Sequence, residues 1–405
     1  MNHALFAIPS HVPPELVVDF DYYTFAGGSD DLHLAWKKLH AGPEIFWTPR
    51  NAGHWVATRA DDIDEIFKNY GQFTSTRGQS IPIKAKPFPF PPVEYDPPDH
   101  TEFRRLIVPF FSPKAMQTLE GRARQLTIEL IESFLDKGEC EFYGDFALQM
   151  PIGIFLGLVD LPESDRLGLL ELANVVVRSP NMNEVQAAFA KTWAYLAEKL
   201  EERRARPGTD LISAMVKGKV FGRALTQQEM LGMGSVALFG GLDTVAATLG
   251  FVANFLAHSP GHRQQLIADP GIIPRAVEEL LRRFAVANLA RTAACDLQFK
   301  GLTIKQGEPI LIPSVLGGLD ERRFADPLVV DFARQDALKH LTFGSGAHRC
   351  IGSLLARTEL KIFLEEWLKR IPDFRLAPGK LRISRSGSVM AIIQLPLSWD
   401  RTSFH

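Results

Sequence analysis

The chain has 405 residues, of which 46% are hydrophobic and 23% are charged, and its formal net charge is −2 at pH 7. This length allows one large domain or two smaller ones with a substantial core. The nearly neutral balance gives no reason to expect a nucleic acid or an anionic membrane as partner. The cysteines Cys140, Cys295 and Cys350 lie far apart, which argues against a disulfide framework and favours a reducing, cytoplasmic setting.

The first hundred residues predict mixed structure. No basic segment followed by an apolar run opens the chain, so we expect no signal peptide or anchor. Residues 44–58 predict two strands around an Asn-Ala-Gly turn, with a helix from about residue 61. Seven prolines in residues 81–98 preclude regular structure there. This segment is either a polyproline ligand for a partner or an ordered loop over a pocket, and Phe88 and Phe90 favour the loop.

From about residue 98 to 285 the apolar spacing is mostly that of helices. The most apolar stretch runs from Leu231 to His258, with Asp243 and Asn254 as its only strongly polar residues. It is long enough to cross a bilayer, but a central aspartate is costly there and the immediate flanks lack Lys/Arg clusters. We therefore expect a helix that is buried in the centre of the fold.

The C-terminal part returns to short strands. Strand pairs are expected within residues 296–314, an irregular glycine-rich stretch over 317–350, a helix from near Ile351 and strands again over 382–399. No linker indicates a second domain. The prediction is one domain over residues 1–405 that is mainly α with small peripheral β-sheets.

Residues 343–352 read FGSGAHRCIG, two glycines followed by a cysteine where a helix is expected to begin. Glycines allow tight turns and close approach of another group. A cysteine near a helix N-terminus has its thiolate favoured by the helix dipole and by free backbone N–H groups. A lone cysteine is usually a small buried apolar residue, but this setting favours a stabilised thiolate at Cys350.

FGSGAHRCIG resembles the heme-ligand signature of the cytochromes P450 at every defined position. ELLR at 279–282 is similar to the Glu-x-x-Arg pair of that family, and GGLDT at 240–244 to its (Ala/Gly)-Gly-x-(Asp/Glu)-Thr motif. DPPDHTEFRR at 96–105 resembles the bacterial stretch that opens the helix crossing the heme. The resemblance extends roughly from residue 15 to 400 and is greatest to soluble bacterial members of the camphor-hydroxylase type.

The resemblance implies a cytochrome P450 fold and a heme b (iron protoporphyrin IX) ligated by Cys350, since an axial thiolate favours O–O cleavage. It implies Arg104, Arg291 and His348 as partners of the heme propionates, with His100 as a further donor on the same helical face as Arg104. For the arginines, the alternative is a solvated surface pair of little energetic weight. The remaining expected heme contacts are Phe343, Gly344 and Gly240.

Two further sets of residues follow from the resemblance. Glu279 and Arg282 can pair on one helical face, and with Arg334 they would hold the loop that carries Cys350; the alternative is an ordinary exposed pair. Activating dioxygen needs protons, which Asp243 would bring from solvent and the Thr244 hydroxyl would pass on. The preceding glycines would let the helix bulge and oxygen sit against the backbone. The alternative is a structural threonine bonded back to a carbonyl.

The expected substrate pocket is apolar. The resemblance suggests walls from Phe88, Phe90, Val236, Phe239, Ala287 and Leu289. Camphor hydroxylases hold their substrate with a tyrosine where this chain has Phe88, and carry an aspartate near the heme where it has Leu289. We therefore expect small or medium apolar terpenoids or norisoprenoids as substrates, with camphor disfavoured.

The chain shows no reductase domain, so electrons are expected from a separate 2Fe-2S ferredoxin and an NAD(P)H-dependent ferredoxin reductase. Arg349 and Arg357 are the expected contacts, because acidic ferredoxins favour basic surfaces, although both could equally be plain surface charges. Two alternatives to a monooxygenase remain. A heme-thiolate peroxygenase would use H2O2 and would not need Asp243 and Thr244, and a non-enzymatic heme sensor would need only Cys350.

Overall fold

Residues 5–25, 31–83, 86–178 and 181–400 are described by the structure, which is a computed structural model. Its α-helices are α1 (Leu32–Lys37), α2 (Ala60–Lys68), α3 (Asp99–Ile107), α4 (Pro113–Leu135), α5 (Gln149–Val159), α6 (Arg166–Arg178), α7 (Met182–Ala205), α8 (Leu211–Lys217), α9 (Gln227–His258), α10 (Pro260–Ala268), α11 (Ile273–Arg283), α12 (Ser314–Gly318) and α13 (Ser353–Arg370). Two short helical turns, η4 (Tyr143–Ala147) and η8 (Gly346–His348), also matter for the site.

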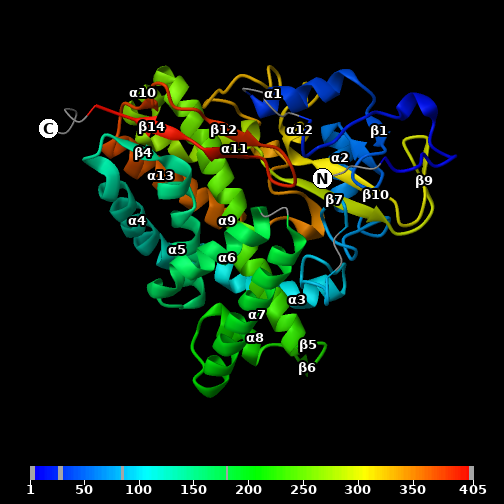
Figure 1. The fold of residues 1–405 in the computed structure, drawn as a ribbon, viewed down its shortest axis with the longest axis horizontal. Helices are drawn as coiled ribbons and strands as arrows, with labels where there is room; N and C mark the ends of the chain where they lie inside the picture. Colours follow the sequence, from blue (N-terminus) through cyan, green and yellow to red (C-terminus); the bar gives the residue numbers. More distant parts are fainter. Residues whose placement is uncertain (1–4, 26–30, 84–85, 179–180, 401–405) are drawn as a thin grey trace.

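The strands are short. They are β1 (Ile45–Thr48), β2 (His54–Ala57), β3 (Phe73–Thr74), β4 (Glu139–Glu141), β5 (Lys219–Val220), β6 (Arg223–Ala224), β7 (Asn288–Ala293), β8 (Leu297–Phe299), β9 (Leu302–Ile304), β10 (Pro309–Pro313), β11 (Arg375–Leu376), β12 (Ile383–Arg385), β13 (Ala391–Gln394) and β14 (Pro396–Ser398). Figure 1 shows the main sheet on one side of the molecule and the helices filling the other, with α9 through the middle. The predicted mainly helical fold with small sheets is confirmed.

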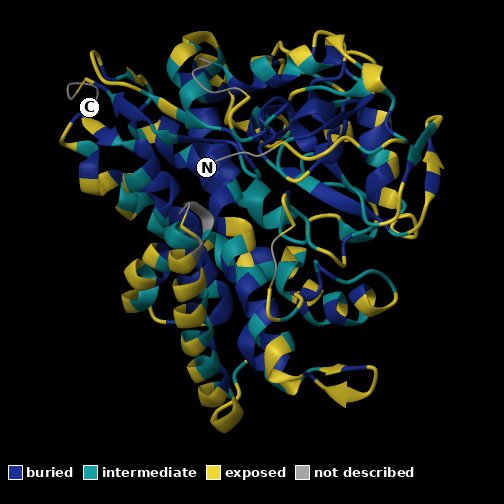
Figure 2. Cartoon of the chain, turned by 45° about the vertical axis from the view of Figure 1, so that its right-hand side comes forward, coloured by how far each residue is buried: buried dark blue, intermediate teal, exposed yellow. Residues whose placement is uncertain are grey.

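Helix α9 is the central element of the fold. It begins at a capping box, in which the Thr226 hydroxyl accepts from the Glu229 amide while the Glu229 carboxylate accepts from the Thr226 amide. It packs against α5, α7 and β13. It is long and apolar enough to cross a bilayer, yet 67% of its most apolar stretch is buried against the rest of the chain. Figure 2 shows that the buried residues gather in the interior of the molecule. Burial of α9 on most sides explains why the helix is apolar almost all round.

The five-stranded sheet has the order β1-β2-β10-β7-β3. β2 and β10 are parallel, with Trp55 opposite Ile310, whereas β10 and β7 are antiparallel, with Ile310 opposite Arg291. Strand β7 directly follows α11 and was not predicted from the sequence. Because side chains alternate along a strand, Leu289 and Arg291 lie on the same face of β7.

The other predicted elements differ mainly in their boundaries. β1, β2 and α2 lie where the first strands and helix were expected, and α13 begins two residues after Ile351. The described residues of the proline-rich segment form no helix or strand. The strand β4 and the hairpin β5–β6 were not predicted, because two or three residues carry too little periodicity to be recognised.

Candidate active site

The cysteine loop is shaped by its two glycines. Gly344 and Gly346 have φ angles of 63° and 67°, values that residues with a Cβ rarely adopt. A Cβ on Gly346 would lie 3.0 Å from both the Phe67 carbonyl oxygen and Lys68 Cα, so this loop approaches the end of α2 closely. The Cys350 amide donates to the Phe343 carbonyl at 2.8 Å, and α13 begins three residues later. The loop therefore presents Cys350 just before a helix, as predicted.

The surroundings of Cys350 act on its pKa in opposite directions. Burial among protein atoms raises the pKa of the thiol, although part of the residue remains accessible to solvent. A hydrogen bond from the Gly352 amide and the charges of Arg104, Arg357 and Arg349 oppose this, but burial dominates. The sequence suggested a stabilised thiolate, whereas burial shifts the pKa of Cys350 upward when no metal ion is bound. A bound metal ion removes the proton from a ligating thiol, so the donor set fits a metal–thiolate ligand.

Four basic side chains from three elements meet beside this loop. They are His100 and Arg104 of α3, Arg291 of β7 and His348 of η8. The rings of His100 and His348 have centroids 4.3 Å apart. His348 Nε2 lies 3.1 Å from both Asp96 Oδ1 and Ser75 Oγ. The sequence-predicted propionate partners are therefore brought together.

The cluster is short of anionic partners. Both ring nitrogens of His100 lack a hydrogen-bond partner within the part of the chain that the structure describes. Burial and then the neighbouring His348 and Arg104 lower the pKa of His100 to about 4. Arg291 is 1% exposed, and burial lowers its pKa to about 10. Buried polar groups normally have partners, so these residues fit a ligand with several anionic oxygens, such as the two propionates of heme.

Arg104 also supports the cysteine loop itself. Its guanidinium donates to the carbonyl oxygen of Arg349, the residue before Cys350. Arg349 is exposed, which leaves its side chain free to serve as a surface contact. Arg357 was predicted to face a redox partner, but its side chain is engaged within the protein. It makes a two-bond ion pair with Glu278 and its guanidinium lies 4.6 Å from the Phe343 ring centroid, so it secures α13 to α11 and to the loop.

The Glu279–Arg282 pair lies at the centre of a buried network. Arg282 donates to the Glu279 carboxylate at 2.7 and 2.8 Å, and both side chains are at most 1% exposed. Arg282 also donates to the carbonyls of Gly318, Pro327 and Val329, and Arg334 Nε lies 3.1 Å from Glu279 Oε1. The three predicted residues do meet. The network holds residues 318–334, the segment that leads into the cysteine loop, rather than the loop itself.

Asp243 and Thr244 point in different directions because successive helix residues are about 100° apart. Asp243 is buried, accepts from the Tyr143 hydroxyl at 3.3 Å and lies 3.8 Å from Arg385 Nη2. The Thr244 hydroxyl donates at 3.3 Å to the carbonyls of Gly240 and Gly241. This is the bonding expected of the alternative, a structural threonine bonded back to a carbonyl. Both bonds are long, so the hydroxyl is weakly held. Helix α9 runs without interruption from Gln227 to His258, so the bulge that was expected near the glycines is absent.

The side of α9 that carries these glycines is open. Gly240 and Gly241 are exposed in the middle of a mostly buried helix, and a Cβ on Gly241 would meet no atom within 4 Å. Thr244, one turn further along, is half-buried on the same side. The helix therefore offers an accessible stretch of backbone beside a hydroxyl.

Aromatic side chains join the proline-rich segment to α7 and α9. The distances between ring centroids are 4.8 Å for Phe88 and Trp193, 5.9 Å for Phe90 and Phe189, and 5.6 Å for Phe189 and Phe239. Phe189 and Trp193 of α7 were not predicted, although two aromatic residues four apart in a helix were a signal that could have found them. The other predicted wall residues, Val236, Ala287 and Leu289, are half-buried.

The comparisons with known proteins show the family of the chain. The family model described as "Cytochrome P450" matches residues 272–385, which include Glu279, Arg282 and the cysteine loop. The "Probable cytochrome P450 127A1" of Sinorhizobium fredii is 35% identical over 97% of each chain. The chain belongs to the cytochrome P450 family. Its fold is a cytochrome P450 fold, since the solved structures of CYP101J2 and CYP101C1 superpose with TM-scores of 0.91 and 0.90 at 36% and 38% identity.

Those two structures each match 97% of this chain and 100% of their own length. The "Mycinamicin IV hydroxylase/epoxidase" of Micromonospora griseorubida is 30% identical over 85% of this chain and 89% of its own. As a cytochrome P450, this protein is a heme-thiolate monooxygenase, and the residues around Cys350 fit that cofactor. Both curated relatives are bacterial proteins, and both solved neighbours carry CYP101 names.

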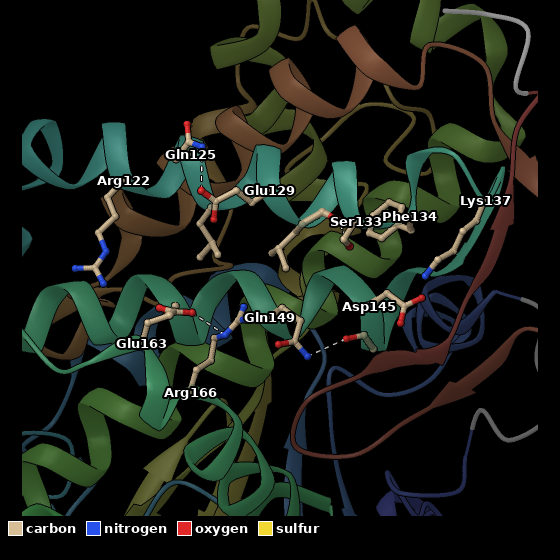
Figure 3. Close-up of a pocket in the computed structure, with 14 residues that line it drawn as sticks. Arg122, Gln125, Glu129, Ser133, Phe134, Lys137, Asp145, Gln149, Glu163 and Arg166 are labelled. Carbon is tan, nitrogen blue, oxygen red and sulfur yellow. Dashed lines mark hydrogen bonds and ion pairs between the residues drawn. The ribbon is translucent and has the colours of Figure 1, made fainter.

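A separate surface cavity of about 710 Å³ lies between α4 and α5. Figure 3 shows charged side chains of both signs around it, including Arg122, Glu129, Glu163 and Arg166. None of the residues that line it belongs to the site described above.

Proposed function

We propose that this cytochrome P450 hydroxylates a small or medium apolar substrate of the terpenoid or norisoprenoid type and that camphor is a poor substrate. The observation that carries this proposal is the run of aromatic rings from Phe88 and Phe90 through Phe189 to Phe239. Large apolar rings recognise apolar surface by area and shape rather than by hydrogen bonding. By its resemblance to camphor hydroxylases, the chain also has Phe88 in place of their substrate-binding tyrosine.

We propose that Cys350 ligates the heme iron and that His100, Arg104, Arg291 and His348 hold the propionates, with Phe343, Gly344 and Gly240 in contact with the ring. When bound, a thiolate-ligated heme supplies the activation of dioxygen and the transfer of one oxygen atom to the substrate. The buried network of Glu279, Arg282 and Arg334 keeps the segment before the cysteine loop in place. A rigid support of this kind fixes the ligand's position without touching the cofactor.

Asp243 and Thr244 would deliver protons. Asp243 Oδ2 lies near Arg385, whose side chain is 29% exposed, so the carboxylate has a route to solvent on that side. The Thr244 hydroxyl, weakly bonded to two carbonyls, can turn to hold a water molecule or donate its proton toward the open side of α9. The two groups face different sides, so a proton passes between them through a side-chain rotation or a bridging water.

Electrons would come from a 2Fe-2S ferredoxin and its NAD(P)H-dependent reductase. The exposed Arg349, adjacent to Cys350, supports docking of an acidic partner on this side. A cytoplasmic location is consistent with the exposed thiol of Cys295. Arg357 is assigned to the internal pair with Glu278 instead.

Product assays with a norisoprenoid (β-ionone), a monoterpene hydrocarbon (limonene) and camphor test the proposal. With ferredoxin, reductase and NADPH, the first two should give hydroxylated products in good yield per NADPH, and camphor should not. Tight, well-coupled camphor hydroxylation would contradict the substrate proposal. Efficient turnover with hydrogen peroxide alone, without dependence on the ferredoxin, would favour a peroxygenase.

A further inference from the structure

The proline-rich segment lies directly on the backbone of α9. A Cβ on Gly232 would lie 2.9 Å from Pro91 Cδ, 3.1 Å from the Pro89 carbonyl oxygen and 3.3 Å from Phe90 Cα. These atoms belong to the backbone and to a proline ring, so they cannot move without moving the segment. Position 232 therefore requires glycine for the segment to reach this position.

A single carboxylate holds the segment in that shape. Glu94 is 7% exposed, and its Oε2 accepts from the Phe90 amide at 2.9 Å. Its other oxygen forms an ion pair with Lys86, whose ammonium lies 4.4 Å from the centroid of the Phe90 ring. Charge-assisted hydrogen bonds of this kind are stronger than neutral ones. Glu94 thus fixes both the backbone of Phe90 and the cation beside its ring.

The same segment connects the walls of the pocket. The Phe90 ring lies 5.9 Å from both Phe88 and Phe189, so it stands between the segment and α7. At the base of the segment, the Gln79 amide side chain donates to the Val93 carbonyl at 2.8 Å, and the Ala290 amide donates to the Gln79 carbonyl at 2.9 Å. Ala290 is next to Leu289 on β7. A shift of Phe90 would therefore change the pocket on more than one side.

We propose that Glu94 is the positioning residue that fixes Phe90 as a wall of the substrate site and thereby sets which apolar ligands the site accepts by size. This inference rests on the proposed function, which places Phe90 at the substrate. In Glu94→Gln, Lys86 loses its counter-ion and the Phe90 amide keeps only a neutral acceptor, which is weaker than a charged one. Phe90 is then no longer held in one position, so a ligand that packs on its ring binds more weakly. A ligand too small to reach the ring is unaffected.

Heme-loaded protein titrated with imidazole and with 4-phenylimidazole tests this inference by absorption spectroscopy. Both compounds coordinate heme iron, but only the second extends toward the walls. Glu94→Gln should weaken 4-phenylimidazole binding roughly tenfold and leave imidazole binding within about twofold. Gly232→Ala, which pushes the segment off α9 from the other side, should give the same pattern.

Two matched controls should leave both affinities unchanged. Glu139→Gln removes another glutamate paired with a lysine, Lys380 at 2.8 Å, but on the exposed surface. Gly121→Ala adds a Cβ to α4 where no atom lies within 4 Å. Amide hydrogen exchange over residues 86–94 should rise in Glu94→Gln and not in the controls.

Unchanged 4-phenylimidazole affinity in Glu94→Gln, an equal loss for both ligands, or unchanged exchange over residues 86–94 would each overturn the inference. The reduced, carbon monoxide-bound spectrum distinguishes this failure from failure of the proposed function. A thiolate-type spectrum with an unaltered ligand ratio removes only the role of Glu94. A wild-type protein without the thiolate spectrum removes the proposed site altogether.

Discussion

At the scale of single residues, Asp243 and Thr244 are adjacent in sequence, but their side chains contact different parts of the protein. Asp243 is buried against Tyr143 and lies near the partly exposed Arg385, two residues that no sequence motif marked. Thr244 is bonded back to Gly240 and Gly241 through two long hydrogen bonds. A hydroxyl shared between two distant acceptors can be recruited for proton transfer at small cost.

Replacing Thr244 distinguishes a relay from a structural threonine. Thr244→Ala should still bind heme and substrate. Its yield of product per NADPH consumed should fall roughly tenfold relative to wild type, because the hydroxyl proton is lost. The measurement is the ratio of product to NADPH oxidised. Thr248→Ala is the matched control, since its hydroxyl donates to the Thr244 carbonyl at 2.8 Å one turn further along. Equal coupling in wild type and Thr244→Ala would make the threonine structural.

At the scale of elements, the motifs predicted which residues meet but not what they hold. Glu279, Arg282 and Arg334 were expected to support the cysteine loop, and they bind residues 318–334 instead. Helix spacing predicts pairing within α11, but the carbonyls that Arg282 reaches lie in irregular chain. The position of such chain depends on the whole fold and leaves no periodic signal.

Removing Glu279 should leave the buried Arg282 without its carboxylate. The expected loss of unfolding free energy is about 3–5 kcal/mol, and Glu279→Ala should be isolated with little heme. Thermal unfolding and the ratio of heme to protein measure the two effects. Glu139→Ala, which breaks the exposed pair with Lys380, should change neither appreciably. Normal heme loading in Glu279→Ala would contradict the role assigned to this network.

At the scale of the whole molecule, long apolar or periodic segments were predictable, whereas several short strands were not. The 32 residues of α9 and the helix α7 were evident from apolar spacing, and α13 was located by the cysteine motif. Strand β7 was missed because five of its six residues are buried, on both faces, and so its sequence does not alternate. This omission concealed why Leu289 and Arg291 face the same side. The contacts of Phe189 and Trp193 with Phe90 and Phe88 became evident only from the structure, which places α7 against the proline-rich segment.

The fold also buries a carboxyl group that the proposed reaction does not use. Glu359 of α13 is 2% exposed, and its Oε2 has no hydrogen-bond partner among the described residues. Burial raises the pKa of Glu359 to about 8, from 4.5 in an unfolded chain. The folded state therefore binds more protons than the unfolded state between these values, so stability is lost as pH rises from about 4.5 to 8.

Glu359→Gln should remove this part of the pH dependence. Relative to wild type, the variant should gain unfolding free energy as pH rises from 5 to 8.5, by an amount on the order of 3–5 kcal/mol. Denaturant unfolding of the heme-loaded proteins across this range measures the difference. Glu132→Gln, on the exposed part of α4, should follow wild type. A constant difference between Glu359→Gln and wild type would show that the carboxyl does not titrate in this window.

The central claim is that Cys350 is the axial ligand of a heme held by the basic cluster at its side. The most direct measurement is the absorption spectrum of the reduced, carbon monoxide-bound protein. The wild type and Cys295→Ser, which alters an exposed cysteine outside the site, should both show the red-shifted Soret band of thiolate ligation. Cys350→His should lose that band. A wild-type protein with the Soret band of histidine ligation would contradict the account.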